Sequence, residues 1–190
     1  MDFSNFENEY GATRRPYGSL EPAALESLTP ALPAELIEFL VQTGQASFGD
    51  GLLWTVDPKP WEPILNGWGP LVAPSVAFAR TALGEVFIWE GNDISVIRPS
   101  ISELWVASFE PKTLFGYTFL DLRYRKNVLR QALVKRCQRR LGALNPDEMF
   151  GASPEYDACA TYDENTLQKI SIFDYHRARA ALQPLRRRSL

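Results

Sequence analysis

The sequence predicts an α+β protein in which an antiparallel β-sheet forms the core and several helices pack on it. Between residues 75 and 108, apolar residues recur at alternate positions, the period that places every second side chain of a strand on one face. Gly84 and Gly91 fall between these runs, and glycine readily adopts the positive φ that tight reversals need. We therefore expect three or four antiparallel strands here, and Pro99, which cannot donate to a ladder, ends the third strand or marks an edge.

Helices and one further strand are expected before this region. Short helices are predicted over residues 22–27 and 61–68, and a strand over residues 52–56. A longer helix is predicted over residues 33–43, because apolar residues recur there with helical spacing and Gly44 suits its C-terminal end. Its apolar stripe consists of Leu36, Ile37, Leu40 and Val41. These helices would cover the sheet.

The C-terminal part of the sequence has mainly helical patterns. Residues 121–141 have helical periodicity, and Gly142 follows as a stop. The apolar side changes after Ala132, which a straight helix with one buried stripe would not do. We therefore expect a bend near residues 131–134 or a helix that is contacted on both sides. Residues 167–182 form either a helix throughout or a short strand followed by a helix.

Four segments are expected along the chain. Residues 1–20 are polar and predict a flexible arm, ordered only where its aromatic residues dock. Residues 21–110 form a first α+β part, and residues 111–183 form a helical part packed on it. The two parts are joined near residues 108–120. Residues 184–190 contain three consecutive arginines and predict a frayed basic tail.

Composition is that of an ordinary soluble globular protein. The chain has 190 residues, 45% of them hydrophobic, which is enough to build a core. No apolar run approaches the roughly 18 residues that span a bilayer, and the first ten residues lack the features of a signal peptide. We therefore expect a cytoplasmic protein with no membrane partner. Cys137 and Cys159 have neither CxxC nor metal-site spacing and are expected to stay reduced.

The net charge of −3 conceals a difference between the two parts of the chain. Residues 1–110 contain 15 acidic and 5 basic residues, whereas residues 111–190 contain 8 acidic and 15 basic residues. The first part would attract cationic partners and the second anionic ones, or the two would neutralise each other across the fold. Both interpretations stay open at this point.

No catalytic signature is visible in the sequence. Cys159, His176 and Asp174 could act as nucleophile, base and orienting acid, but a single histidine in 190 residues favours coincidence and a half-exposed helix position for His176. Two cysteines and one histidine supply too few soft ligands for a zinc site. The glycine-rich turn at residues 49–51 lacks the lysine of a phosphate loop. We therefore expect no cofactor, no metal and no enzymatic activity.

Two stretches resemble a known bacterial family. Residues 33–65 resemble the opening of the GAD-like domain in immunity proteins of type VI secretion systems, with a helix, a glycine-rich turn, a strand containing tryptophan, and Asp-Pro before a short helix. The matching positions are Pro33, Ala34, Glu35, Leu36, Gly49, Gly51, Trp54, Asp57 and Pro58. Residues 144–151 are similar to an element of the Tdi-type module that continues the chain in that family. The positions that carry this similarity are Asp147, Glu148, Met149, Phe150 and Gly151.

The resemblance covers most of residues 22–182 and implies a function. The sequence is similar to the immunity partner of a DNase effector from a pseudomonad, except that residues 152–154 depart from the usual continuation of the second element. Such a protein would bind its cognate toxin effector, expected to be a basic nuclease, and block it stoichiometrically in the cytoplasm. It would not bind nucleic acid directly.

The acidic first part of the chain supplies candidate contacts for such a toxin. Its carboxylates fall in turns or near strand ends between tryptophans, so the acids would steer a cationic partner and the rings would anchor it. A DNase is basic where it grips phosphate, and an acidic protein could occupy that surface. The candidate contact residues are Asp50, Asp57, Trp61, Glu62, Glu85, Glu90 and Asp93. Alternatively, the tryptophans fill the core and the acids keep the protein soluble.

Two other functions stay open. The basic helix over residues 121–141, with aromatic residues before and within it, has the composition of a nucleic-acid-binding module. An isoelectric point near 5.3 argues against this function, and bases on a solvated helix face are common. The third possibility is an enzyme that uses Cys159 and His176, for which loss of function in a folded Cys159→Ala variant would be the sign.

Overall fold

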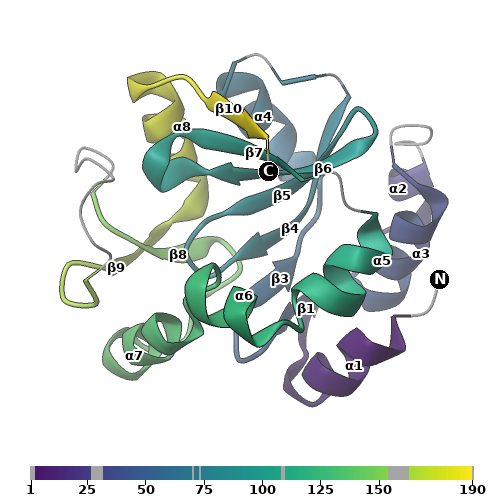
Figure 1. The fold of residues 1–190 in the computed structure, drawn as a ribbon, viewed down its shortest axis with the longest axis horizontal. Coiled ribbons are helices and arrows are strands. Elements are labelled where there is room, and N and C mark those ends of the chain that lie inside the picture. Colours follow the sequence, from purple (N-terminus) through teal and green to yellow (C-terminus); the bar gives the residue numbers. More distant parts are fainter. Residues whose placement is uncertain are drawn as a thin grey trace.

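The computed structural model describes residues 3–26, 32–69, 71–72, 74–107, 110–153 and 163–189. Within these ranges, eight strands form one sheet in the order β1-β2-β3-β4-β5-β6-β7-β10, and two more form a separate ladder, β8-β9 (Figure 1). The strands are β1 (Arg15–Gly18), β2 (Gln45–Phe48), β3 (Leu53–Thr55), β4 (Ser75–Thr81), β5 (Val86–Glu90), β6 (Asp93–Arg98), β7 (Glu103–Ala107), β8 (Glu148–Gly151), β9 (Gln168–Ser171) and β10 (Arg186–Ser189). All pairings are antiparallel except that of β10 with β7. The expected α+β class with an antiparallel core is confirmed.

Helices lie on both sides of this sheet. Figure 1 shows α1, α2, α3 and α5 on one side, and α7 and α8 on the other. The helices are α1 (Ser4–Tyr10), α2 (Pro22–Glu26), α3 (Ala34–Thr43), α4 (Glu62–Gly67), α5 (Pro111–Thr113), which a π-helical turn (Leu114–Thr118) continues, α6 (Leu122–Asn127), α7 (Gln131–Leu141) and α8 (Ile172–Leu182). Among the described residues, no helix combines the length and the apolarity needed to cross a membrane.

The strands expected over residues 75–108 are β4 to β7. The two glycines of the intervening turns, Gly84 and Gly91, have φ angles of 88° and 67°, a region that side chains rarely enter. Pro99 opens a 3-10 turn directly after β6, as its missing N–H predicts. The alternating pattern therefore identified the centre of the sheet.

The first 20 residues have regular structure instead of forming the expected arm. Their described part, residues 3–20, contains α1, a 3-10 turn and β1, which pairs with β2 at the edge of the sheet. Phe6 and Tyr10 on α1 are buried, and the Tyr10 hydroxyl donates a hydrogen bond to the carbonyl of Phe119 (2.8 Å). Burial of these aromatic side chains explains why the segment is part of the core.

The frayed tail expected over residues 184–190 is also wrong, because β10 forms there. Arg187 on β10 pairs with Glu90, whose side chain is fully buried at the end of β5 (2.8 Å). The Glu90 carboxylate also accepts hydrogen bonds from the Val72 N–H (2.6 Å) and the Ser95 hydroxyl (2.8 Å). A buried carboxylate needs such partners, and Arg187 supplies the opposite charge.

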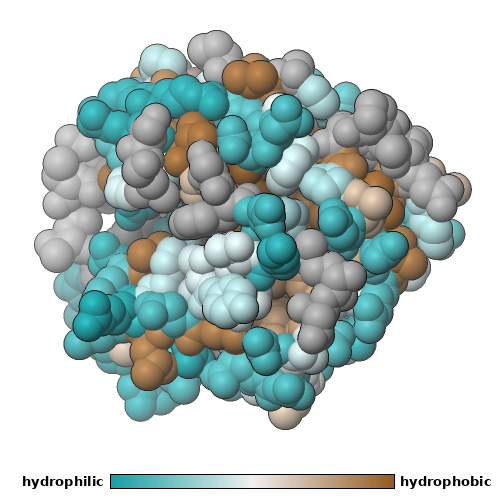
Figure 2. Space-filling model, turned by 45° about the vertical axis from the view of Figure 1, so that its right-hand side comes forward, coloured by the Kyte–Doolittle hydropathy of each residue, from teal (hydrophilic) through white to brown (hydrophobic). Residues whose placement is uncertain are grey.

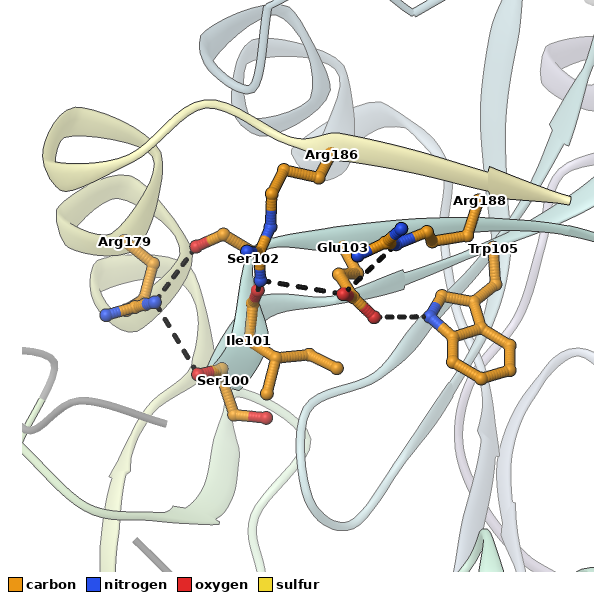
Figure 3. A network of polar contacts seen from close by, with 8 residues as sticks. All are labelled: Ser100, Ile101, Ser102, Glu103, Trp105, Arg179, Arg186 and Arg188. Atoms are coloured by element: carbon orange, nitrogen blue, oxygen red, sulfur yellow. Dashed lines mark hydrogen bonds and ion pairs between the residues drawn. The ribbon is translucent and has the colours of Figure 1, made fainter. Parts of the chain in front are cut away.

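Glu103 on β7 pairs with two further arginines of β10. Figure 3 shows its carboxylate between Arg186 and Arg188, at N···O distances of 3.5 and 3.4 Å. Its other oxygen accepts a hydrogen bond from the Trp105 indole N–H (2.8 Å). That bond, more than the two arginines, holds the pKa of the Glu103 carboxyl below its usual value, whereas burial acts in the opposite direction. Each arginine of β10 thus has a carboxylate within the chain.

The two faces of the sheet are packed differently. On one face, aromatic rings from α1, α3 and the π-helical turn cluster, with the Phe6 ring centre 5.2 Å from that of Phe115 and 6.0 Å from that of Phe39. Phe48 of β2 joins this cluster, 5.1 Å from Phe6. Ser47, its neighbour in sequence, points to the opposite face because strand residues alternate. That second face carries the polar residues considered below.

The helix expected over residues 121–141 is interrupted and forms α6 and α7. Arg130, between the two helices, has a left-handed backbone with φ of 50°. The interruption lies just before the bend expected at residues 131–134 and accounts for the change of apolar side. The side chains of α7 that are buried are Leu133, Val134 and Cys137.

Candidate functional site

A groove of about 800 Å³ lies between α7 and the strands at the β1 edge of the sheet. β1, β2, β3 and the β2–β3 turn form one side, α7 forms the other, and residues 143–146 complete it. Its charged lining residues are Asp50 and the four bases Arg15, Lys135, Arg136 and Arg139. Its larger apolar and aromatic residues are Tyr17, Trp54, Leu144 and Pro146. The groove therefore combines an apolar lining with excess positive charge.

Strand register explains the sheet side of the groove. Residues paired across neighbouring strands share a face, so one row of side chains runs from the β1 edge towards the centre. From the edge inward, the paired positions are Arg15, Ser47, Trp54 and Arg80. Trp54 is held in place, because its indole N–H donates to the Gly51 carbonyl (2.8 Å) and the Arg80 guanidinium carbon lies 4.2 Å from the ring centre.

The helix side of the groove presents bases to solvent. Lys135 and Arg139 are exposed and lie one helical turn apart, so they share a face of α7. Neither forms an ion pair with any residue that the structure describes. The Gln138 amide donates a hydrogen bond to the Asp50 carbonyl and so ties α7 to the β2–β3 turn. This contact fixes the distance between the two sides of the groove.

Two other bases of the groove have acidic neighbours. Arg136 pairs with Glu164, the side chains being roughly two fifths exposed. Arg15 approaches Asp50 at 3.8 Å, and both side chains are more than half exposed. Exposed pairs of this kind contribute about 0–1 kcal/mol and exchange readily with other partners.

Arg80 is fully buried behind Trp54. Its guanidinium donates to the carbonyls of Thr81 (3.2 Å) and Pro146 (2.9 Å). Within the described residues, its Nε has no hydrogen-bond partner, and no carboxylate lies within ion-pair distance of the group. Burial lowers the pKa of Arg80 to about 10, so the side chain remains charged at neutral pH. A cation without a directly bonded carboxylate thus lies beneath the row that forms the groove.

His176 is fully buried on α8, which corrects the expected half-exposed position. Its Nδ1 accepts a hydrogen bond from the Trp68 indole N–H (3.0 Å), so its Nε2 carries the proton and donates to the Gly84 carbonyl (2.9 Å). Burial lowers the pKa of His176 to about 4, which keeps the ring neutral. Asp174 is exposed and pairs with Arg177 (2.7 Å). His176 therefore joins α8, α4 and the β4–β5 turn.

Cysteine chemistry gains no support from this arrangement. Cys159 lies outside the described residues, so its proposed grouping with His176 is not seen. Cys137 is buried in α7 as a free thiol, and burial raises its pKa, which disfavours the reactive thiolate. Within the described ranges, no three His, Cys, Asp or Glu side chains come together as a metal site.

The candidate toxin contacts do not form one cluster. Asp50 and Glu85 lie in turns at one end of the strands, whereas Asp57, Glu90 and Asp93 lie at the other end. Burial separates these residues further. Trp61, Glu85 and Glu90 are only 2%, 4% and 3% exposed, so their expected place on an accessible surface is wrong.

The physical reasons for this burial differ. Trp61 packs its ring against Phe173 and His176, with ring centres 5.0 and 5.3 Å away. Glu85 accepts a hydrogen bond from the Thr81 hydroxyl inside the β4–β5 turn. Glu90 is paired with Arg187. Trp61 and Glu90 are buried against partners far along the chain, and Glu85 against a partner in its own turn.

Four of the candidate acids stay at least partly accessible. Asp50 is exposed beside the groove, and Glu62 is exposed in the first turn of α4. Asp57 and Asp93 are half-buried, and Asp57 accepts a hydrogen bond from the Lys59 N–H (3.0 Å). These four side chains are the remaining candidates for an acidic contact surface.

The family-motif positions shape the backbone around the groove. Gly49, Asp50 and Gly51 have φ angles of 60°, 56° and 85°, so three successive left-handed residues make the β2–β3 turn. Pro33 precedes the first turn of α3, and Pro58 precedes a 3-10 turn. The first motif therefore fixes the turn that carries Asp50 and receives Gln138.

The second motif interlocks with the centre of the sheet. Gly84 in the β4–β5 turn has a positive φ of 88°, which favours glycine, and a Cβ atom there would lie only 2.6 Å from the sulfur of Met149, so the methionine packs directly on this turn. Glu148 pairs with Lys169 across the β8–β9 ladder (3.0 Å), and Asp147 is exposed. Met149 thus contributes packing, and Glu148 contributes an ion pair.

Sequence reasoning missed the groove, although two signals were present. Arg80 is a charged residue inside an otherwise apolar run, and Lys135 and Arg139 have the spacing that places two bases on one helix face. The contribution of Arg15 could not be foreseen, because its segment was expected to be an arm.

A second, more open hollow of about 620 Å³ lies near the π-helical turn and α6. Tyr117 is exposed there, and the rest of the lining comes from Asn5, Gly116, Thr118, Leu120, Asp121 and Tyr124. Figure 2, which brings the side carrying α1 and α5 forward, shows apolar patches separated by hydrophilic side chains. The lining of this hollow contains one charged side chain, Asp121, and none of the bases that line the groove beside α7.

Comparison with known proteins identifies the family. The model of the GAD-like domain matches residues 2–101. The crystal structure of Atu4351 from Agrobacterium tumefaciens is similar in fold, with a TM-score of 0.74 and 13% identity, over 99% of this chain and 92% of that one. A search of curated proteins finds no match. Because the family match spans more than half of the sequence, the chain belongs to the GAD-like domain family.

Proposed function

We propose that this protein is a cytoplasmic immunity protein that binds an effector of a type VI secretion system and blocks it stoichiometrically. The observation that carries the proposal is the GAD-like domain over residues 2–101, together with the resemblance of residues 33–65 and 144–151 to immunity proteins of such systems. The effector we propose is a nuclease toxin. The protein would protect the cell that makes it by occupying or distorting the toxin.

The burial of His176 and Arg80, the two groups with strongly lowered pKa, supports a binding function over an enzymatic one. His176 has both ring nitrogens engaged inside the core, and Arg80 is enclosed behind Trp54. A catalytic group must reach its substrate, and neither side chain is accessible. The accessible features are surfaces, namely the groove beside α7 and the exposed acids Asp50 and Glu62.

Inhibition at equimolar amounts tests the proposal. Tagged protein captures its partner from the source cell, and DNA cleavage by that partner is followed as the protein is added back. We expect cleavage to stop near one protein per toxin, because a stoichiometric inhibitor needs no turnover. DNA cleavage that continues in a tenfold excess of the protein would contradict the proposal.

A nucleic-acid-binding module is the second candidate, and one observation favours it. Arg15 joins three bases of α7 in a single groove that also contains Tyr17 and Trp54. Direct titration of a labelled single-stranded DNA or RNA at 150 mM salt discriminates the two functions. The immunity function predicts no binding at micromolar protein, whereas binding that falls after charge reversal of Lys135 and Arg139 would support the second candidate.

A further inference from the structure

We propose that the groove between α7 and the β1 edge binds an acidic, extended segment of the effector protein. The inference rests on the proposed function for the source of the segment, and on the groove itself for its chemistry. Two exposed bases on α7, an edge strand and an apolar lining meet in this place.

The first step is charge. Four bases and one acid line the groove, and the exposed pairs formed by Arg15 and Arg136 exchange easily. Lys135 and Arg139 have no ion-pair partner among the described residues. A ligand that presents carboxylates at two positions along its length would complement these two side chains.

The second step is the buried cation behind the groove. Arg80 lies in the same row of side chains as Arg15, Ser47 and Trp54, and no described carboxylate forms an ion pair with it. Water is excluded around Arg80, so its field is weakly screened. Asp147 and Glu148 offset part of this charge, so Arg80 adds a partly compensated buried cation beneath the exposed bases.

The third step is shape. β1 is the outermost strand of the sheet, and in the described residues its other side pairs with no strand. An extended segment can run along such an edge, where Pro16 offers its carbonyl but no N–H, while the side chains of the segment alternate between two surfaces. Tyr17 and Leu144 offer apolar contacts beside the bases. The groove thus suits a segment in which acidic and apolar residues alternate.

A protein segment fits this groove better than a polynucleotide does. Asp50 lines the groove, and exposed Asp147 directly follows its lining residue Pro146. A long polyanion would meet these acids and a protein whose isoelectric point is near 5.3. A short segment can place its carboxylates opposite Lys135 and Arg139 and avoid the acids.

Selection from a displayed library of random twelve-residue peptides tests the proposal, followed by fluorescence anisotropy of the enriched peptides. We expect enrichment of Asp or Glu next to apolar residues. Affinity should fall about tenfold or more for the double variant Lys135→Glu, Arg139→Glu, since both contacts become repulsive. The matched control, Arg123→Glu, Lys126→Glu, reverses two exposed bases of α6 outside the groove and should stay within twofold of the wild type.

Circular dichroism must first show that both double variants are folded. Enrichment without acidic residues, or equal affinities of the two double variants, would overturn the proposal. Tighter binding of oligothymidylate than of any peptide, lost in the groove variant, would assign the groove to nucleic acid instead. If the groove variant inhibits the captured effector as well as wild type does, the groove proposal fails and the immunity function stands. If wild type fails to inhibit, the immunity function fails, and the peptide affinities still decide the chemistry of the groove.

Discussion

The two edges of the eight-stranded sheet both carry basic residues, but in the part of the chain that the structure describes only the β10 edge pairs each of them with a carboxylate. At the β10 edge, Arg186 and Arg188 contact Glu103 on the neighbouring strand β7 (Figure 3), and Arg187 contacts Glu90 at the end of β5. At the β1 edge, the bases of the groove outnumber its acids, and Lys135 and Arg139 have no ion-pair partner in the described part of the chain. Both edges are basic, so the difference lies in the carboxylates that pair with the bases. The β10 edge is neutralised and stabilises the fold, whereas the β1 edge is the proposed binding edge.

Removal of residues 186–190 should have the largest effect, because it deletes β10 and leaves Glu90 buried without its counter-charge. We expect a loss of about 4 kcal/mol in the free energy of unfolding. The uncovered edge of β7 should also promote self-association, because an open strand pairs with other chains. Urea denaturation and size-exclusion chromatography measure the two effects. A truncated protein as stable and monomeric as wild type would mean that β10 adds nothing.

Acid should weaken the region that leads into β10, through His176 on α8. Well above pH 6.5 the ring is neutral in both folded and unfolded chains, so its contribution is complete. As pH falls from 6.5 towards about 4, only the unfolded chain takes up the proton, and stability decreases by about 3 kcal/mol in total. Below that range both states are protonated and no further loss arises from this group.

The His176 effect is best measured between pH 6.5 and 5, before carboxylates begin to titrate. Chemical denaturation should show a loss of about 2 kcal/mol over this interval. His176→Gln, whose amide can donate to Gly84 and accept from Trp68, is the matched control and should be almost independent of pH there. An equal slope in both proteins would assign the pH dependence to other groups.

Two arginine-to-alanine substitutions compare the edges directly. Arg187→Ala should cost about 2 kcal/mol, because Glu90 stays buried with only two neutral hydrogen-bond donors. Arg15→Ala should change stability by less than about 0.5 kcal/mol, because its pair with Asp50 is long and exposed. Equal costs in urea denaturation would contradict the distinction between the edges.

A small effect on stability is also expected for the groove variant Lys135→Glu, Arg139→Glu. Both side chains are exposed, so the free energy of unfolding should change by less than about 1 kcal/mol, mainly through the helix dipole near the end of α7. Thermal denaturation measures this change. A large loss would mean that these bases stabilise the fold.

The centre of the fold could be predicted from the sequence, and its edges could not. Alternation of apolar residues over 75–108 is a local signal and led to β4–β7. β1 and β10 are four residues long and pair with strands distant in sequence, so local pattern alone does not reveal them. Their stability comes from tertiary contacts such as Arg187 with Glu90.

The same limit applies to the candidate site. Charged residues are usually exposed, so Glu85 and Glu90 were assigned to the surface, yet specific partners allow their burial. Bases on α7 were visible as a helix face, but their meeting with Arg15 depends on a strand that the sequence did not indicate. The glycine-rich turn at residues 49–51 was recognised through its resemblance to the family.

Hydrogen–deuterium exchange of the protein with and without its captured partner tests the central claim most directly. We expect slower exchange in β1, the β2–β3 turn and α7 when the partner binds, because the groove becomes covered. Exchange in β10 should stay unchanged, because this strand already pairs with β7 and its Arg187 with Glu90. Protection confined to β10 and β7, with none around the groove, would contradict the account.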